Sequence, residues 1–173
     1  MNRQFTNIFE ILTSSGARLP RIEQWLRNDV WSPERFAQLD SQHYFESGEK
    51  LVKSAEDIVL SSASSVYDEL VAASQSSVSL LETLKQPKTA IVVFDGMSIR
   101  EIPLILKLTA DTNFTVCESR YDYAALPSDT LAFIEQRLIG KRIGPSQIES
   151  RKELKDCNIV ARHYDTLIRM FEP

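Results

Sequence analysis

The sequence has few cysteines and no long apolar run, and both shortages limit what the protein is. Its two cysteines, Cys117 and Cys157, form no CxxC motif. This argues against a structural disulfide and indicates a reducing compartment. No segment approaches the roughly 18 apolar residues that a membrane-spanning helix needs, and the N-terminus lacks the apolar core of a signal peptide. We therefore expect a cytoplasmic protein that does not associate with membranes.

Positive charge is not in excess either. The 173 residues include 20 Lys and Arg against 24 Asp and Glu, which gives a net charge of −4. This balance does not support nucleic-acid binding over the whole surface, although it leaves room for a local basic patch. The apolar fraction of 43% and the charged fraction of 25% are typical of a globular protein with one ordinary core.

Three glycine motifs that mark nucleotide-binding or hydrolytic folds are missing from the sequence. A P-loop needs G-x-x-x-x-G-K-[ST], but Gly140-Lys141 has neither the earlier glycine nor a following Ser or Thr. There is no G-x-G-x-x-G for a dinucleotide and no G-x-S-x-G nucleophile elbow. These absences exclude the P-loop NTPases and leave the other two classes without support.

Residues 1–88 show the periodicity of helices. Apolar residues of the first helix recur at i, i+3, i+4 and i+7: Phe5, Ile8, Phe9 and Leu12. Ser32-Pro33-Glu34 predicts a helix start, with serine as the cap and proline at the first helical position. The pattern continues over residues 49–84, where the serine-rich run 61–65 is either a joint between two helices or a phosphorylated or disordered linker.

Residues 89–173 read differently, because TAIVVFDGMSIRE (89–101) joins a short apolar run to Asp95. A continuous run rich in β-branched residues predicts a strand buried on both faces, as in a parallel sheet. A carboxylate at the end of such a strand lies where α/β sheets bind their ligands. Residues 113–118 and 156–163 predict two further strands. The expected fold is therefore α/β, with a mostly parallel sheet and flanking helices after the helical region 1–88.

A helix is expected soon after Asp95, because Ser98 and Glu101 have the spacing of a capping box. Pro103 indicates that the regular helix starts a residue or two later, since a proline past the first turn removes a backbone hydrogen bond. Arg100 and Glu101 either orient a substrate or form an exposed pair on this helix. The sequence leaves both possibilities open.

Thr130 opens another predicted helix, 35 residues after Asp95. A carboxylate can hold a divalent cation, which lowers the pKa of a coordinated hydroxyl so that it attacks a phosphate ester. The alternatives are structural: Asp95 caps a loop, and either Thr130 or Ser128 caps the helix. The candidate site is Asp95 as a metal ligand and Thr130 as both ligand and catalytic nucleophile.

The segment IVVFDGMSIRE, followed at this distance by ALPSDT, resembles the PglZ family. These are bacterial phage-defence proteins of the alkaline-phosphatase superfamily, best known from BREX systems. The resemblance covers about residues 89–140. It implies a partial alkaline-phosphatase-like core with Asp95 as a ligand and Thr130 as the metal-bound nucleophile of a phosphoester or phosphodiester hydrolase. The implied metal is zinc or manganese.

Members of that superfamily complete a two-metal site with further Asp and His residues after the nucleophile. In this sequence His163 is the only histidine after Thr130, and Asp165 is the acid near it. We therefore expect the N-terminal portion of a longer hydrolase, with little or no activity and weak or no metal binding by this chain alone.

Two further interpretations remain open. Residues 137–152 contain five cations against the single acid Glu149: Arg137, Lys141, Arg142, Arg151 and Lys152. They either attract a phosphodiester or nucleic acid or form a solvated loop. The chain as a whole is alternatively a non-catalytic scaffold of a defence complex, in which residues 1–88 dock a protein partner.

Overall fold

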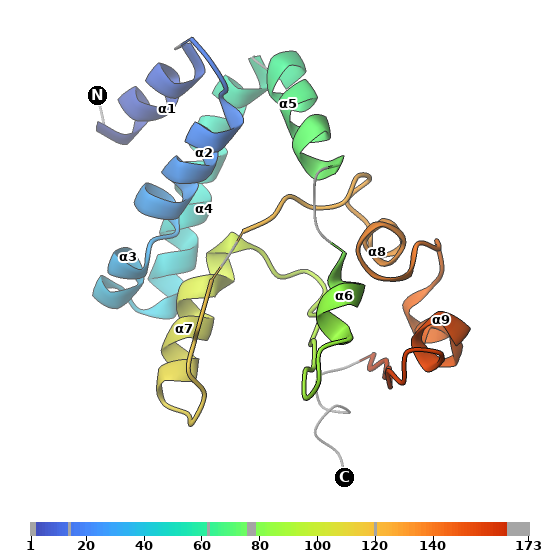
Figure 1. Ribbon diagram of the computed structural model, residues 1–173. Helices are drawn as coiled ribbons and strands as arrows, with labels where there is room; N and C mark the ends of the chain where they lie inside the picture. Colours follow the sequence, from blue (N-terminus) through green and yellow to red (C-terminus); the bar gives the residue numbers. More distant parts are fainter. Residues whose placement is uncertain (1–2, 14, 62, 76–78, 120, 166–173) are drawn as a thin grey trace. The chain divides into compact units, whose positions relative to one another are not determined.

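The computed structural model describes residues 3–13, 15–61, 63–75, 79–119 and 121–165 (Figure 1). The chain forms two compact units. The first unit comprises Met1–Ala72 and Gly96–Tyr121, and the second comprises Ala73–Asp95 and Asp122–Pro173. Among the described helices, none has both the length and the apolar character needed to cross a membrane.

The first unit is built from helices and short helical turns. It contains α1 (Arg3–Thr13), α2 (Leu19–Trp25), η1 (Leu26–Val30), α3 (Pro33–Gln38), α4 (Ser41–Ser61), most of α5 (Ala63–Gln75), η2 (Ile99–Glu101) and α7 (Ile102–Ala110). The predicted start of α3 is confirmed, because Ser32 has an extended backbone and its side chain accepts a hydrogen bond from the Arg35 N–H. The predicted break near residues 61–65 is the joint between α4 and α5; Ser62 itself lies outside the described residues.

An aromatic cluster forms the core of the first unit. Tyr44 of α4 is fully buried, and the rings of Trp31 and Phe36 meet it edge-on at 5.5 and 5.0 Å between centroids. Burial raises the pKa of Tyr44 to about 12, and its hydroxyl donates to the Arg100 carbonyl. Gly48 lies one turn along α4, where a Cβ atom would stand 2.0 Å from the Trp31 ring. Glycine is therefore needed inside this helix to admit the indole.

The second unit has shorter elements and a smaller core. It contains α6 (Leu80–Leu84), α8 (Thr130–Phe133), η3 (Ile134–Ile139), η4 (Pro145–Ser150) and α9 (Lys152–Lys155). The buried residues Ile134, Ile139 and Leu154 form its centre. Gly140 ends η3 in the left-handed conformation with φ of 68°, as its position after the apolar pattern predicted.

The predicted α/β fold with a mostly parallel sheet is wrong, because the described residues contain helices and no strand. The three segments expected as strands are 89–94, 113–118 and 156–163. Several of their apolar side chains are exposed instead of buried: Val92 52%, Val93 51%, Phe114 80% and Val160 79%. Ile159 and Ala161 are partly buried against the core of the second unit. A β-branched run forms a strand only where neighbouring strands satisfy its backbone and cover its side chains. No such neighbour is present in the described part of this chain.

Candidate functional site

Asp95 lies at the end of an irregular segment, in a turn with Gly96. Gly96 has φ of +75°, a value that favours glycine, and no atom lies within 4 Å of where its Cβ would be. Its backbone conformation, rather than a lack of space, therefore calls for glycine there. The turn leaves Asp95 exposed at the surface of the second unit.

Thr130 is the first residue of α8, but it does not cap that helix. The cap is Asp129, whose backbone is extended and whose Oδ1 accepts the Ala132 N–H at 2.6 Å. The sequence had suggested Ser128 or Thr130 for this role and missed Asp129. Aspartate is as good an N-cap as serine, so this signal was present in the sequence. With Asp129 as cap, the Thr130 hydroxyl is available for another partner.

That partner is Asp95. The Thr130 hydroxyl donates to Asp95 Oδ2 at 3.1 Å, across 35 residues of sequence. Both residues belong to the second unit. The structure therefore brings together the two residues that the sequence singled out, without the sheet that was expected to position them.

The other oxygen of Asp129 meets Arg142, at 2.7 Å from its Nη2 atom. The backbone N–H of Ala132 is the main cause that lowers the pKa of Asp129, and Arg142 adds to it. Arg142 also approaches Glu135 at 3.7 Å. The residue next to Thr130 is thus a carboxylate held in its charged form by a helix end and a guanidinium.

Arg137 anchors this region from inside. It is only 5% exposed, and its Nη2 atom donates to the Tyr123 carbonyl at 2.8 Å and to the Ser74 carbonyl at 3.4 Å. Its Nη1 atom lies 3.6 Å from the Asp122 carboxylate. The sequence had placed Arg137 in a basic surface patch. Nothing local in the sequence marks it as buried, since its partners lie 14 and 63 residues away.

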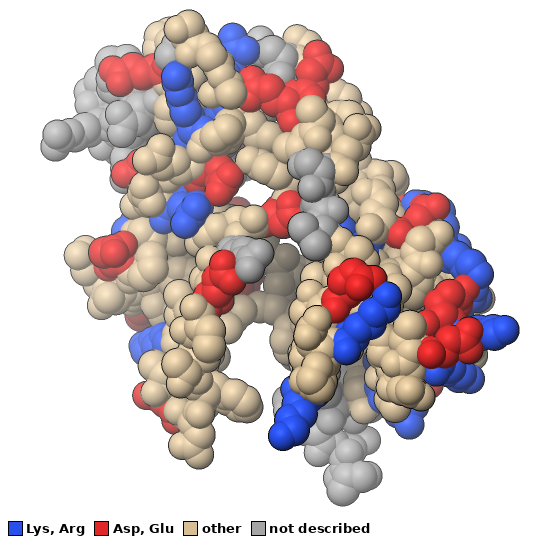
Figure 2. All heavy atoms as spheres, viewed as in Figure 1, with Lys and Arg blue, Asp and Glu red and all other residues tan. Residues whose placement is uncertain are grey.

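The remaining members of the predicted basic patch are largely neutralised. Lys141 and Arg151 both pair with Glu153, and Lys141 is the main cause that lowers the pKa of Glu153 to about 2. Arg142 is paired as described above. Figure 2 shows the same alternation, with red and blue side chains intermixed around α9. The described contacts pair most of these cations with carboxylates, so the loop does not present a surface of uniformly positive charge.

Arg100 and Glu101 are structural in the first unit. The predicted capping box is present, with the Glu101 carboxylate accepting from the Ser98 N–H at 2.7 Å. Arg100 pairs with Glu101 and also with Glu49 of α4, each at 2.5 Å. Their contacts fasten η2 to α4.

The donor set of Asp95 and Thr130 suits a hard divalent cation, but it is small. Within the part of the chain that the structure describes, no group of three or more His, Cys, Asp or Glu residues is arranged to hold a metal. His163 is exposed, and its backbone N–H donates to Glu149 at 2.7 Å. Carboxylate and hydroxyl oxygens fit Mg²⁺ or Mn²⁺ best, and zinc commonly adds His or Cys. Two side chains alone supply fewer donors than the six or more oxygen ligands that such a cation takes.

Comparison with known proteins does not identify a family for this chain. No family model matches the chain, and neither a curated protein nor a solved structure matches it.

Proposed function

We propose that this chain is the N-terminal portion of a metal-dependent phosphoester or phosphodiester hydrolase of the PglZ type, linked to phage defence. Asp95 is a metal ligand in this proposal, and Thr130 is both ligand and nucleophile. The observation that carries it is the 3.1 Å hydrogen bond from the Thr130 hydroxyl to Asp95 Oδ2. This contact is present although the described residues contain no strand.

The chemistry follows from what the two side chains can do. A divalent metal, when bound, would lower the pKa of a hydroxyl that it coordinates. Asp95 accepts the Thr130 proton in a hydrogen bond and so orients the hydroxyl oxygen. In the proposed step Thr130 Oγ1 would form a bond to phosphorus while the bond from phosphorus to the leaving alcohol oxygen breaks and that oxygen takes up the proton. Water would then cleave the phosphothreonine and regenerate the hydroxyl.

Asp129 supports this role by leaving Thr130 free. Because Asp129 caps α8, the Thr130 hydroxyl does not have to bond to the backbone of the helix. Arg142 holds the second oxygen of Asp129 and keeps that carboxylate in place. Further ligands would have to come from residues outside those described, so we expect weak metal binding and little activity from this chain alone.

The test is a titration with Mn²⁺ followed by NMR, because paramagnetic broadening reports even weak binding. We expect broadening of the backbone amides centred on Asp95 and Thr130, together with weak heat changes when zinc or manganese is added in a calorimeter. Asp95→Ala should abolish the local broadening. Asp156→Ala removes another exposed carboxylate of the second unit and is the matched control.

The same variants decide against the proposal if the broadening is spread over many carboxylates, or if it persists in Asp95→Ala. A chain extended beyond Pro173 gives a second measurement, hydrolysis of bis(p-nitrophenyl) phosphate with Mn²⁺. There, Thr130→Ala should abolish turnover and Thr130→Ser should retain some of it, since serine keeps the nucleophilic oxygen. Equal activity in all three proteins would remove Thr130 from the mechanism.

A non-catalytic role is the second candidate, and one observation favours it. Large apolar side chains are exposed on the helices of the first unit: Phe9 57%, Leu60 62% and Tyr67 60%. Such exposure suits a scaffold that docks a protein partner of a defence complex through residues 1–88. The non-catalytic role is favoured over the hydrolase if the extended chain neither binds metal at Asp95 nor hydrolyses a phosphoester.

A further inference from the structure

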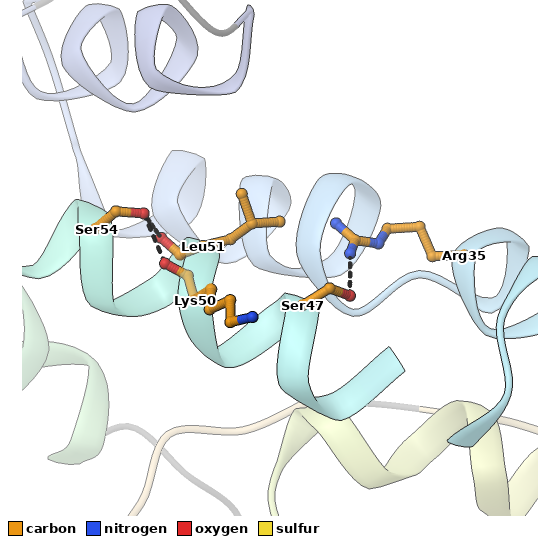
Figure 3. A pocket seen from close by; sticks show the side chains of 5 residues that line it. All are labelled: Arg35, Ser47, Lys50, Leu51 and Ser54. Carbon is orange, nitrogen blue, oxygen red and sulfur yellow. Dashed lines mark hydrogen bonds between the residues drawn. The ribbon is translucent and has the colours of Figure 1, made fainter. Parts of the chain in front are cut away.

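One face of α4 forms a hollow with α3 in the first unit. Ser47, Lys50, Leu51 and Ser54 recur on α4 at i, i+3, i+4 and i+7, and Arg35 faces them from α3 (Figure 3). The hollow has a volume of about 450 Å³, which is within the range of small-ligand sites. Its lining contains two cations and no carboxylate.

Arg35 is held firmly, yet its charge is not balanced. Its Nη1 atom donates to the Asp29 carbonyl at 3.0 Å and its Nη2 atom donates to Ser47 Oγ at 2.7 Å. A guanidinium has five N–H groups, so three of them remain for a ligand. The side chain is half-buried, and no acid of the described chain lies within ion-pair distance of it. An oriented guanidinium without a counter-ion is suited to bind an anion.

Lys50 is the second cation of the hollow, and among the described residues it also has no ion pair. Some other described cations, such as Lys53 and Lys107, likewise have no ion pair, so it is the position of Lys50 beside Arg35 in the lining of the hollow that distinguishes it. Lys50 also lines a neighbouring hollow, together with Glu46 and Glu49. The Ser54 hydroxyl stays on the α4 backbone, at 2.7 Å from the Lys50 carbonyl.

We propose that this hollow binds a small molecule carrying a phosphate monoester. Arg35 supplies paired N–H donors whose fork matches two phosphate oxygens, and Lys50 supplies a second positive charge for a dianion. Leu51 offers an apolar wall for the rest of the ligand. The site lies in the first unit and is independent of the function proposed for Asp95 and Thr130.

A purely structural role for Arg35 makes a different prediction. Arg35 links the Asp29 carbonyl of η1 to Ser47 of α4, so it also helps to hold α3 in place. If this link were the whole role of Arg35, the hollow would bind no anion. Replacing Lys50, which does not take part in the link, would then leave the response to phosphate unchanged. Lys50 therefore separates the two interpretations.

The experiment titrates the whole chain with phenyl phosphate and, separately, with inorganic phosphate, and follows backbone amide shifts by NMR. Sodium chloride at equal ionic strength is the reference for screening alone. We expect saturable shifts at Arg35 and over residues 47–54, with phenyl phosphate bound more tightly than inorganic phosphate. Lys50→Gln should weaken binding at least about tenfold, as expected for loss of a charge-assisted contact.

Lys53→Gln is the matched control, since Lys53 is exposed one turn away and does not line the hollow. It should bind phenyl phosphate like the unmodified chain. Arg35→Lys should weaken binding as well, and Lys50→Gln keeps the test decisive if Arg35→Lys unfolds the first unit. Shifts that never saturate, that chloride reproduces, or that are the same in Lys50→Gln would overturn the proposal.

Discussion

The interiors of the two units are filled by different kinds of residue. The first unit packs rings around the fully buried Tyr44, with Trp31 and Phe36 edge-on against it. The second unit has three buried aliphatic residues at its centre and, beside them, the buried guanidinium of Arg137. Apolar packing depends on shape, whereas a buried cation depends on the carbonyls and the acid that surround it. Substitutions that alter shape should therefore matter most in the first unit, and substitutions that alter charge should matter most in the second.

The largest effect is expected from Gly48→Ala, because an added Cβ would collide with the Trp31 ring at 2.0 Å. We expect the free energy of unfolding of the first unit to fall by about 3 kcal/mol, as overpacking in a dense core does. Tryptophan fluorescence during urea unfolding measures this, since both tryptophans, Trp25 and Trp31, lie in the first unit.

Gly144→Ala is the control in the second unit. No atom lies within 4 Å of its Cβ position and its φ is −68°, so the change should stay within about 0.5 kcal/mol. Equal effects of the two substitutions would contradict the close packing of Trp31 on α4.

Arg137→Leu tests the charged interior of the second unit. It removes the bonds to the Tyr123 and Ser74 carbonyls, and we expect a loss of about 2 kcal/mol. Hydrogen exchange of residues 122–139, read by mass spectrometry, should rise strongly. Arg162→Leu is the matched control, because Arg162 is exposed and its guanidinium reaches only the neighbouring Ala161 carbonyl. An unchanged exchange rate in Arg137→Leu would show that packing alone supports this unit.

Removing one helix cap from each unit should have a smaller effect on stability and allows the two units to be compared directly. Ser32→Ala removes the cap of α3 and Asp129→Ala removes the cap of α8, and each should cost about 1 kcal/mol. Asp129→Asn keeps a capping oxygen but loses the charge that faces Arg142. Because exposed ion pairs contribute little to stability, Asp129→Asn should unfold at nearly the same temperature as the unmodified chain. A loss as large as that of Asp129→Ala would mean that the charge matters more than the cap.

Acid is expected to give the smallest effect, and the surface network around Glu153 in the second unit is where we would measure it. Lys141 is the main cause that lowers the pKa of Glu153 from 4.5 to about 2. A carboxyl with a lowered pKa stabilises the folded state fully above about pH 4.5, and this contribution is lost as pH falls toward 2. Amide exchange around α9 should therefore rise over that interval, and Glu153→Gln should remove the change. Tyr44, with a pKa raised to about 12, stays neutral throughout.

The sequence predicted those features whose causes lie within a few residues. The cap at Ser32, the capping box of Ser98 and Glu101, and the stop at Gly140 are all present. Asp95 and Thr130 were selected from sequence and are joined by a hydrogen bond. Asp129 was missed as the cap, although an aspartate directly before a helical pattern was visible.

The sequence could not predict features whose partners are remote. Arg137 reads as one more cation of a basic loop until its contacts 14 and 63 residues away are known. The contact of Arg35 with Ser47 of α4 joins residues 12 apart, and no local pattern in the sequence indicates it. The apolar run before Asp95 reads as a buried strand, yet Val92 and Val93 are half-exposed.

The sequence by itself determined several helix ends, those at Ser32, Ser98 and Gly140, and which nucleotide-binding motifs are absent. The reason is that helical hydrogen bonds and caps join residues three or four positions apart. Tertiary structure alone decided that the β-branched runs form no strand in the described residues, and which cations meet carboxylates. Strand pairing, burial and ion pairing each need a second segment brought in from elsewhere in the chain.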